Sequence, residues 1–232
     1  MRLDRLGRES FRAAEGRAVA HVAPDCRIYL VVEAGPAAIA GLTAAADVAD
    51  IACCLIVPAA VPLTAAAARS IVEAAQRAGV AALIANDAGL ARAVRADGVH
   101  LAASRNPVTA YAAARQSLGR EAIVGADVGI SRHDAMSLAE AGADYVAFGA
   151  PAHLQDRTRA HARRDDLVAW WGEIFEVACV ALDVEIPAEA ERLARAGADF
   201  VAVTLPPGQS AAATRDLVAG IGAAIGASAE AG

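Results

Sequence analysis

Acidic side chains follow several of the short apolar runs in this sequence. They are Glu33, Asp87, Asp127 and Asp183, each at or next to the end of a run. If these runs are parallel strands of one sheet, the carboxylates meet on one rim, where mutual repulsion raises a pKa or a divalent cation is attracted. An acid at a strand end also caps the next helix or binds loop amides, and this alternative stays open for each of them.

Arginines are concentrated in the segment HLQDRTRAHARR, residues 153–164. We expect a flexible basic loop here that closes over a phosphate, with Arg157 and Arg159 as contacts, because arginine binds phosphate bidentately. For the second arginine pair, Arg163 and Arg164, we favour the solvated start of a helix, since two aspartates follow them.

Other polar residues stand at the ends of the remaining runs. They include Asn86, Ser104, Arg105, Glu185 and Thr204. The segment TLPPGQS places Gly208 and Ser210 before a helical stretch, where free amides and the helix dipole favour an anion. His100 lies inside an apolar run, and we expect a packed or rim histidine there rather than a ligand. We find no Ser, His, Asp triad and no His-rich metal spacing in the sequence.

The elements that must position these residues alternate regularly along the chain. Short β-branched runs predict strands at residues 27–34, 50–58, 81–86, 98–102, 122–127, 145–150, 179–183 and 200–204. Ala-rich stretches predict helices between them, among them residues 64–78, 107–118, 131–141, 187–196 and 210–225. Such an order is typical of βαβ units with a parallel sheet.

The sequence also repeats itself. AGADYVAFG at residues 141–149 matches AGADFVAVT at residues 196–204, and ARAVRADGVHLA is a weaker third copy. Each copy is expected to be a helix end, a turn and a strand. Eight such units without a GxGxxG after the first strand favour an α/β fold of the (β/α)8 TIM barrel type over an open sheet. We expect residues 1–26 to be an N-terminal helical extension and residues 27–228 to be the single barrel domain.

The composition limits the class of partner. The formal net charge of −6 provides no broad cationic field for nucleic acid or an anionic membrane, so a small-molecule partner is expected. The four cysteines lack CxxC spacing and are expected to be free thiols. Without a secretory h-region, the chain is expected to be cytoplasmic. The uncharged run at residues 51–68 is broken by two prolines and is expected to be strand, loop and helix. Exposed apolar helix faces are compatible with a homodimer.

Three local motifs carry a family resemblance. AND at residues 85–87, ADGVHL at residues 96–101 and GADYVAFG at residues 142–149 are arranged as in thiamine phosphate synthase and its relatives, which are (β/α)8 barrels. The resemblance implies a transferase of thiamine biosynthesis that joins a pyrimidine diphosphate to a thiazole phosphate and releases diphosphate. Mg²⁺ as cofactor is implied with it.

The resemblance also implies roles for single residues. Asn86 and Asp87 match the diphosphate and metal contacts, with Asp87 as the metal ligand. Asp156 to Arg159 is similar to the family's basic T-K-T-K-like loop, so Arg157, Thr158 and Arg159 are expected to contact substrate, although arginine differs from lysine in geometry. By their position at strand ends or in the loops that follow, Arg105, Asp127, Asp183, Thr204 and Gly208 complete the expected binding set for a small phosphorylated or heterocyclic ligand.

The sequence departs from the family pattern at several of these places. The polar Q-L-R-x-K-type signature of the second strand is the apolar CCLIVP, residues 53–58. The G-Q-E-D-like turn after GVHL is AASR here, with Arg105 at an acidic position. Asp127 replaces a small serine, and Asp183 with Val184 replaces a Gly-Gly pair that presents amides to phosphate.

Three functions are compatible with this pattern. The first is the thiamine phosphate synthase reaction with a divergent site. The second is a noncatalytic barrel that binds a ligand or partner as a regulator. The third is metal-assisted chemistry on a smaller, less anionic substrate at the acidic rim of Asp87, Asp127 and Asp183.

Overall fold

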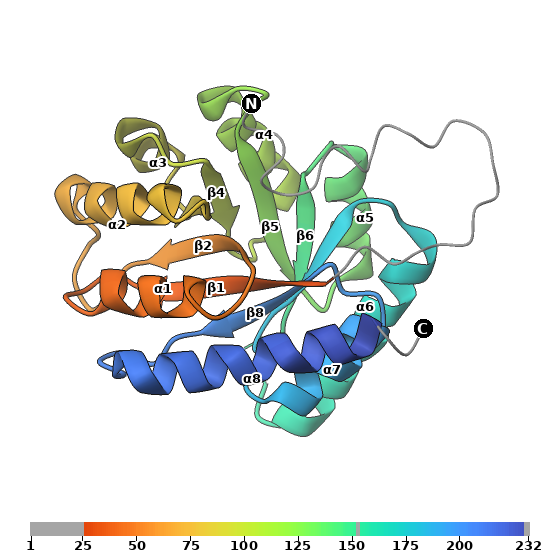
Figure 1. Ribbon diagram of the computed structural model, residues 1–232. Helices are drawn as coiled ribbons and strands as arrows, with labels where there is room; N and C mark the ends of the chain where they lie inside the picture. Colours follow the sequence, from red (N-terminus) through yellow and green to blue (C-terminus); the bar gives the residue numbers. More distant parts are fainter. Residues whose placement is uncertain (1–25, 152–153, 230–232) are drawn as a thin grey trace, which may run out of the picture.

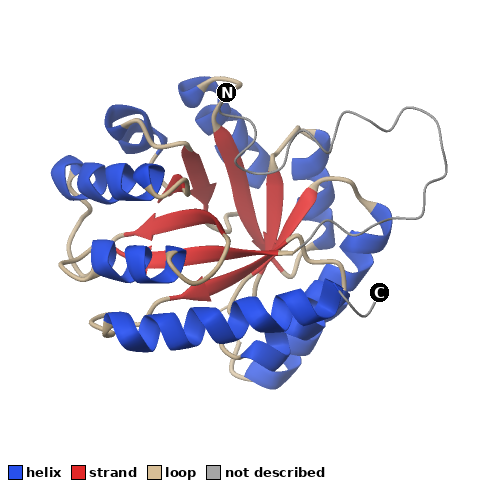
Figure 2. Ribbon diagram, in the orientation of Figure 1, coloured by secondary structure: helices blue, strands red, loops and turns tan. Residues whose placement is uncertain are grey.

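A closed parallel barrel forms the centre of the molecule. The computed structural model describes residues 26–151 and 154–229, so the extension expected at residues 1–26 lies outside the described residues except for Cys26. Eight strands pair in sequence order, and the last strand pairs with the first. Figures 1 and 2 show the strands in the middle and the helices on the outside. The predicted (β/α)8 barrel is confirmed.

Each strand is followed by a helix. The strands are β1 Arg27–Glu33, β2 Ile51–Val57, β3 Ala81–Ala85, β4 Gly98–Leu101, β5 Ile123–Gly129, β6 Tyr145–Phe148, β7 Ala178–Ala181 and β8 Phe200–Thr204. The helices are α1 Ala38–Ala46, α2 Ala65–Arg77, α3 Ala88–Val94, α4 Pro107–Leu118, α5 Arg132–Glu140, α6 Arg157–Ile174, α7 Pro187–Arg195 and α8 Ala211–Ala229. The uncharged run at residues 51–68 is strand, loop and helix as predicted, and no described helix is long and apolar enough to cross a membrane.

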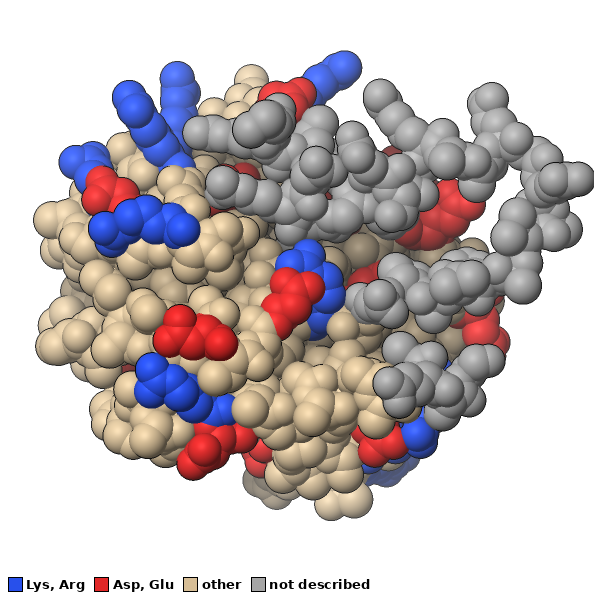
Figure 3. Space-filling view, in the orientation of Figure 1, with Lys and Arg blue, Asp and Glu red and all other residues tan. Residues whose placement is uncertain are grey.

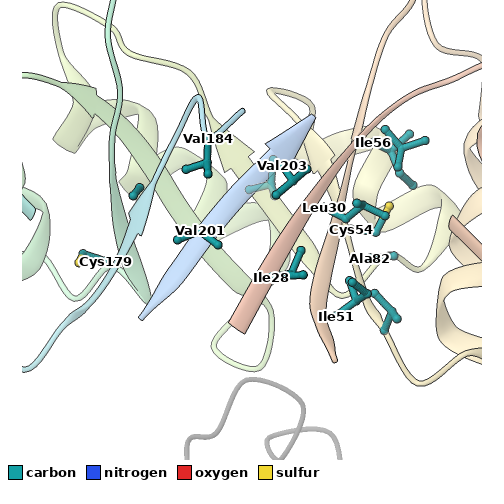
Figure 4. Close-up of a cluster of buried hydrophobic side chains, with 14 of the residues drawn as sticks. Ile28, Leu30, Ile51, Cys54, Ile56, Ala82, Cys179, Val184, Val201 and Val203 are labelled. Atoms are coloured by element: carbon teal, nitrogen blue, oxygen red, sulfur yellow. The ribbon is translucent and has the colours of Figure 1, made fainter. Parts of the chain in front are cut away.

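Side chains that alternate along the strands fill two separate cores. The larger core lies between the barrel and the helices, and Figure 4 shows Ile28, Leu30, Val201 and Val203 as part of it. Burial of this apolar surface is the main force that holds the helices on the strands. The smaller core fills the barrel interior and includes Leu55, Leu83, Val180 and Phe200. The interior is therefore packed, and substrate access is limited to the ends of the barrel.

A polar cluster lies inside this second core. The hydroxyls of Tyr29 and Tyr145 are 3.0 Å apart, and the Tyr145 hydroxyl is 2.8 Å from Nδ1 of His100. Burial lowers the pKa of His100 to about 4, so the imidazole is neutral at physiological pH. Gly125 makes room for the cluster, because a Cβ at this position would come within 2.2 Å of the Tyr145 ring. His100 is thus a packed histidine, as predicted.

The sequence repeats correspond to a repeated contact at the amino-terminal end of the barrel. Asp97, Asp144 and Asp199 each stand in the turn before an even-numbered strand. Their carboxylates accept the backbone N–H groups of Ala82, Val124 and Cys179 on the preceding odd-numbered strands, at 2.7 to 2.9 Å. Each aspartate therefore satisfies a backbone donor near the start of its neighbouring strand.

Candidate active site at the carboxyl ends of the strands

Asn86 connects the ends of two neighbouring strands. Its backbone adopts a left-handed conformation with φ of 58°, which asparagine tolerates better than most residues. Its N–H donates to the carbonyl of His100 at 2.8 Å, and its side-chain Oδ1 accepts the N–H of Ala102 at 2.6 Å. The amide nitrogen Nδ2 has no hydrogen-bond partner among the described residues. Asn86 therefore keeps two donors available at the rim.

Asp87 caps the helix that follows. Its Oδ1 accepts the N–H of Leu90 at 2.7 Å, which is the usual contact of an aspartate before the first helical residue. The side chain is exposed, as is Arg105 in the loop between β4 and α4. The helix-capping alternative is thus confirmed for Asp87. Its second carboxylate oxygen can still take part in ligand binding.

Asp127 is half-buried at the end of β5. Its Oδ1 accepts the N–H of Gly129 at 2.7 Å. Desolvation raises the pKa of this carboxyl above its ordinary value, the Gly129 N–H opposes the rise, and the charge of Asp183 adds to it. The expected repulsion between rim carboxylates therefore involves Asp127 and Asp183.

Asp183 connects β7 with β6. Its backbone is left-handed, with φ of 60°. Its Oδ2 accepts the N–H of Ala150 at 3.0 Å and lies 3.9 Å from an Arg157 guanidinium nitrogen. The other terminal nitrogen of Arg157 donates to the carbonyls of Ala150 and Pro151. The end of β6 is thus linked to both residues.

The expectation of a flexible basic loop is wrong for the arginines themselves. Residues 157–159 form the first turn of α6, and the Asp156 carboxylate caps this helix through the N–H of Arg159 at 3.0 Å. Thr158 and Arg159 are exposed. An aspartate followed by helix-favouring residues is a helix start signal, and Asp156 is such a residue.

The expectation for Arg164 is also wrong, whereas Arg163 is exposed as predicted. Arg164 is completely buried. It donates to the carbonyls of Leu182 and Asp183 at 2.7 and 3.1 Å and pairs with the carboxylates of Asp165 and Glu189. A buried guanidinium needs such partners to offset its desolvation, and together they anchor the loop between β7 and α7. Periodicity along one helix gave no sign of partners on α7.

The loop after β8 forms a small cleft beside β1. Glu33, Leu205, Gly208, Gln209 and Thr214 contribute to its lining, and its volume is about 30 Å³. Gly208 has a φ of 73°, and Thr204 is exposed at the end of β8. Oε1 of Gln209 is buried without a hydrogen-bond partner among the described residues. This corner therefore retains unused polar groups.

The charged residues named at this rim are of both signs, with Asp87, Asp127 and Asp183 acidic and Arg105 and Arg159 basic. Figure 3 shows acidic and basic side chains interspersed on the visible face rather than gathered into one field. Within the described residues there is no group of three or more His, Cys, Asp or Glu side chains able to hold a metal ion. An all-protein metal cage is therefore absent from this part of the chain.

Comparison with known proteins places the chain in a family. A family model described as thiamine monophosphate synthase matches residues 59–205. The thiamine-phosphate synthase of Rhodospirillum centenum is 38% identical over 189 residues, which cover 77% of this chain and 87% of that protein. The chain belongs to the thiamine monophosphate synthase family.

Two further similarities agree with this family. The thiamine-phosphate synthase of Erythrobacter litoralis is 43% identical over 126 residues, covering 53% of this chain and 58% of that protein. The match thus spans less than two thirds of that relative. Thiamine phosphate pyrophosphorylase from Pyrococcus furiosus superimposes with a TM-score of 0.68 at 16% identity, covering 90% of this chain and 99% of the other, which supports the fold.

Proposed function

We propose that this member of the family catalyses the thiamine phosphate synthase reaction. A pyrimidine diphosphate and a thiazole phosphate are joined at the carboxyl ends of the strands, and diphosphate leaves. The observation that carries the proposal is the 38% identity with a thiamine-phosphate synthase over 77% of the chain, since this span includes most of the barrel.

The leaving diphosphate requires donors and positive charge. Asn86 supplies its Nδ2 donors because its Oδ1 is already engaged by Ala102. Arg105 and Arg159 are exposed on the loop after β4 and the first turn of α6, and they offer guanidinium groups to phosphate oxygens. They would replace the basic residues that the family carries on its second strand.

A magnesium ion would be held jointly by this protein and by the diphosphate of the substrate. Mg²⁺ is usually held by one or two carboxylates together with substrate phosphates and water, so a cluster of three protein ligands is not required. Asp87 would hold the ion with its second oxygen, since Oδ1 serves the Leu90 N–H. The ion would neutralise charge on the departing diphosphate.

The thiazole phosphate would be bound by the remaining corners of the rim. Thr204 and Gly208 lie at the end of β8 and before α8, where a hydroxyl and backbone amides suit an anion. Asp127 lies on β5, between the strands proposed to bind the diphosphate and the strand proposed to bind the thiazole phosphate. Its carboxylate would accept a hydrogen bond from a substrate amino group. Because the pKa of Asp127 is raised, protonation at low pH would weaken this role.

We also propose a cytoplasmic location. All four cysteines are free thiols, and burial raises the pKa of Cys26 and Cys54 to about 12. Such buried, unreactive thiols suit a reducing compartment.

The proposal is tested by thiamine phosphate formation from both substrates and Mg²⁺, followed as fluorescent thiochrome after oxidation. We expect turnover by the wild-type protein and its loss in Asp87→Ala. Asp50→Ala is a matched control at the opposite end of the barrel, where the exposed carboxylate pairs with Arg27 at 2.6 Å. Well-folded protein without turnover would rule out the synthase reaction and favour the noncatalytic ligand-binding alternative.

A further inference from the structure

The carboxylate of Asp183 occupies a position that is suited to an external anion. A backbone N–H from Ala150 and the guanidinium of Arg157 converge on its Oδ2, at 3.0 and 3.9 Å. A backbone donor together with an arginine is a common way of binding a phosphate oxygen. In this protein the same donors are engaged by a side chain of the chain itself.

The position of Asp183 is fixed by buried groups. Arg164, which has no exposed surface, donates to the carbonyls of Leu182 and Asp183. Arg164 is held in turn by Glu189, whose second carboxylate oxygen accepts the N–H of Glu185 at 3.1 Å. The backbone of the loop is therefore anchored on both sides of Asp183, whose own side chain is 42% exposed.

A second carboxylate strengthens the negative character of this corner. Desolvation raises the pKa of the Asp127 carboxyl, and the nearby charge of Asp183 adds to this rise. A phosphate placed at the Ala150 N–H would have to displace one carboxylate and approach another. The displacement of the Asp183 carboxylate and the repulsion from Asp127 both oppose binding of a dianion.

We propose that Asp183 is an internal anion that closes the corner between β6 and β7 to phosphate and thereby sets specificity. The part of a ligand that lies in this corner is uncharged or donates hydrogen bonds. The inference deepens the proposed synthase reaction by stating that the acceptor phosphate is excluded here and must bind near β8. Removal of the carboxylate opens the corner, frees the Ala150 N–H and leaves the Arg157 guanidinium without the nearby negative charge.

Direct binding of inorganic phosphate tests this without any need for turnover. Calorimetric titration at constant ionic strength, with chloride as the reference anion, compares wild type with Asp183→Gly and Asp183→Asn. Both replacements tolerate the left-handed backbone, so folding should be preserved and is checked by the melting temperature. Glu185→Gln is the matched control, because it removes one charge from the same loop and leaves both donors engaged.

We expect at least tenfold tighter phosphate binding in Asp183→Gly than in wild type. A smaller gain is expected in Asp183→Asn, whose amide oxygen still accepts the Ala150 N–H. No gain is expected in Glu185→Gln, and Arg157→Ala should abolish the gain when combined with Asp183→Gly. Equal affinity in wild type and Asp183→Gly would overturn the proposal, as would an equal gain in Glu185→Gln.

The synthase assay separates this inference from the proposed function. If the protein is a synthase, inorganic phosphate should inhibit turnover more strongly in Asp183→Gly than in wild type, because the opened corner accepts an anion away from the productive position near β8. If wild type shows no turnover but the order of phosphate affinities holds, the synthase proposal fails and the role of Asp183 stands.

Discussion

The aspartates at the two ends of the barrel are used in different ways. At the amino-terminal end, Asp97, Asp144 and Asp199 repeat one contact, each accepting an N–H from the preceding odd-numbered strand. At the carboxyl end no contact recurs in this way: Asp87 caps a helix, Asp127 binds a glycine two residues on, and Asp183 reaches across to β6. Only the first set follows the sequence repeat.

This difference separates acids that serve the scaffold from acids that can serve a ligand. A contact repeated before β4, β6 and β8 meets one common need, which is an acceptor for a backbone N–H near the start of the neighbouring strand. Contacts that differ from strand to strand have no such common cause. The exposed carboxylate of Asp87, for example, uses one oxygen to cap a helix and keeps the other for a ligand. The comparison predicts stability defects at one end and functional defects at the other.

The largest effect is expected for Asp144→Ala. The Asp144 side chain is 6% exposed, pairs with Arg115 at 2.6 Å and accepts the Val124 N–H. Its removal leaves a guanidinium and a backbone donor without this partner, which costs roughly 3–5 kcal/mol of unfolding free energy. Urea denaturation measures the loss. A change below 1 kcal/mol would show that the repeated contact does not support the scaffold.

The barrel interior between the two ends should govern sensitivity to acid. The pKa of His100 is about 4 in the folded state, below the ordinary value of 6.5, so the unfolded chain binds a proton that the native state excludes. The free energy of unfolding therefore falls as pH drops from about 6.5 to 4, by about 3 kcal/mol in total. His100→Gln should flatten this part of the pH profile. An unchanged profile would assign the sensitivity to other groups.

Asp87→Asn should separate function from stability at the rim. Asparagine caps a helix about as well as aspartate, so the contact with the Leu90 N–H is kept and stability should change by less than about 1 kcal/mol. Turnover should fall about a hundredfold, because the carboxylate oxygen proposed to share Mg²⁺ loses its charge. Unfolding and thiochrome formation are measured on the same preparations, and a parallel loss in both would make Asp87 a scaffold residue.

The smallest effect is expected for Asp127→Asn, and it has the opposite sign. Desolvation raises the pKa of the Asp127 carboxyl, so its charged form destabilises the native state at neutral pH. Asparagine keeps an acceptor for the Gly129 N–H and removes the charge, so a gain of up to about 1 kcal/mol is expected from thermal or urea unfolding. Destabilisation would show that the charged form is bound favourably.

The fold could be predicted from the sequence because its signals are local and repeated. Strand runs alternate with Ala-rich helices, and the copies of AGAD mark the turns before β6 and β8. The start of α6 is harder to predict, because the charge of its arginines favours a phosphate-binding loop while a single capping aspartate before them indicates a helix.

The partners of the site residues could not be predicted because they come from distant elements. Arg164 is 25 residues from Glu189, and the Tyr145 hydroxyl meets His100 across 45 residues. Packing of separate elements in the folded barrel brings these pairs together. The positions of Asn86 and Asp87 at the rim followed from strand ends, whereas the contact of Asp183 with Ala150 required the structure.

Phosphorus NMR of wild-type protein with a pyrimidine diphosphate, a thiazole phosphate and Mg²⁺ shows directly whether the protein performs the synthase reaction. Both products are observed in one spectrum. We expect equal amounts of thiamine phosphate and inorganic diphosphate, formed as both substrates are consumed. Unchanged substrate signals in the presence of well-folded protein would contradict it.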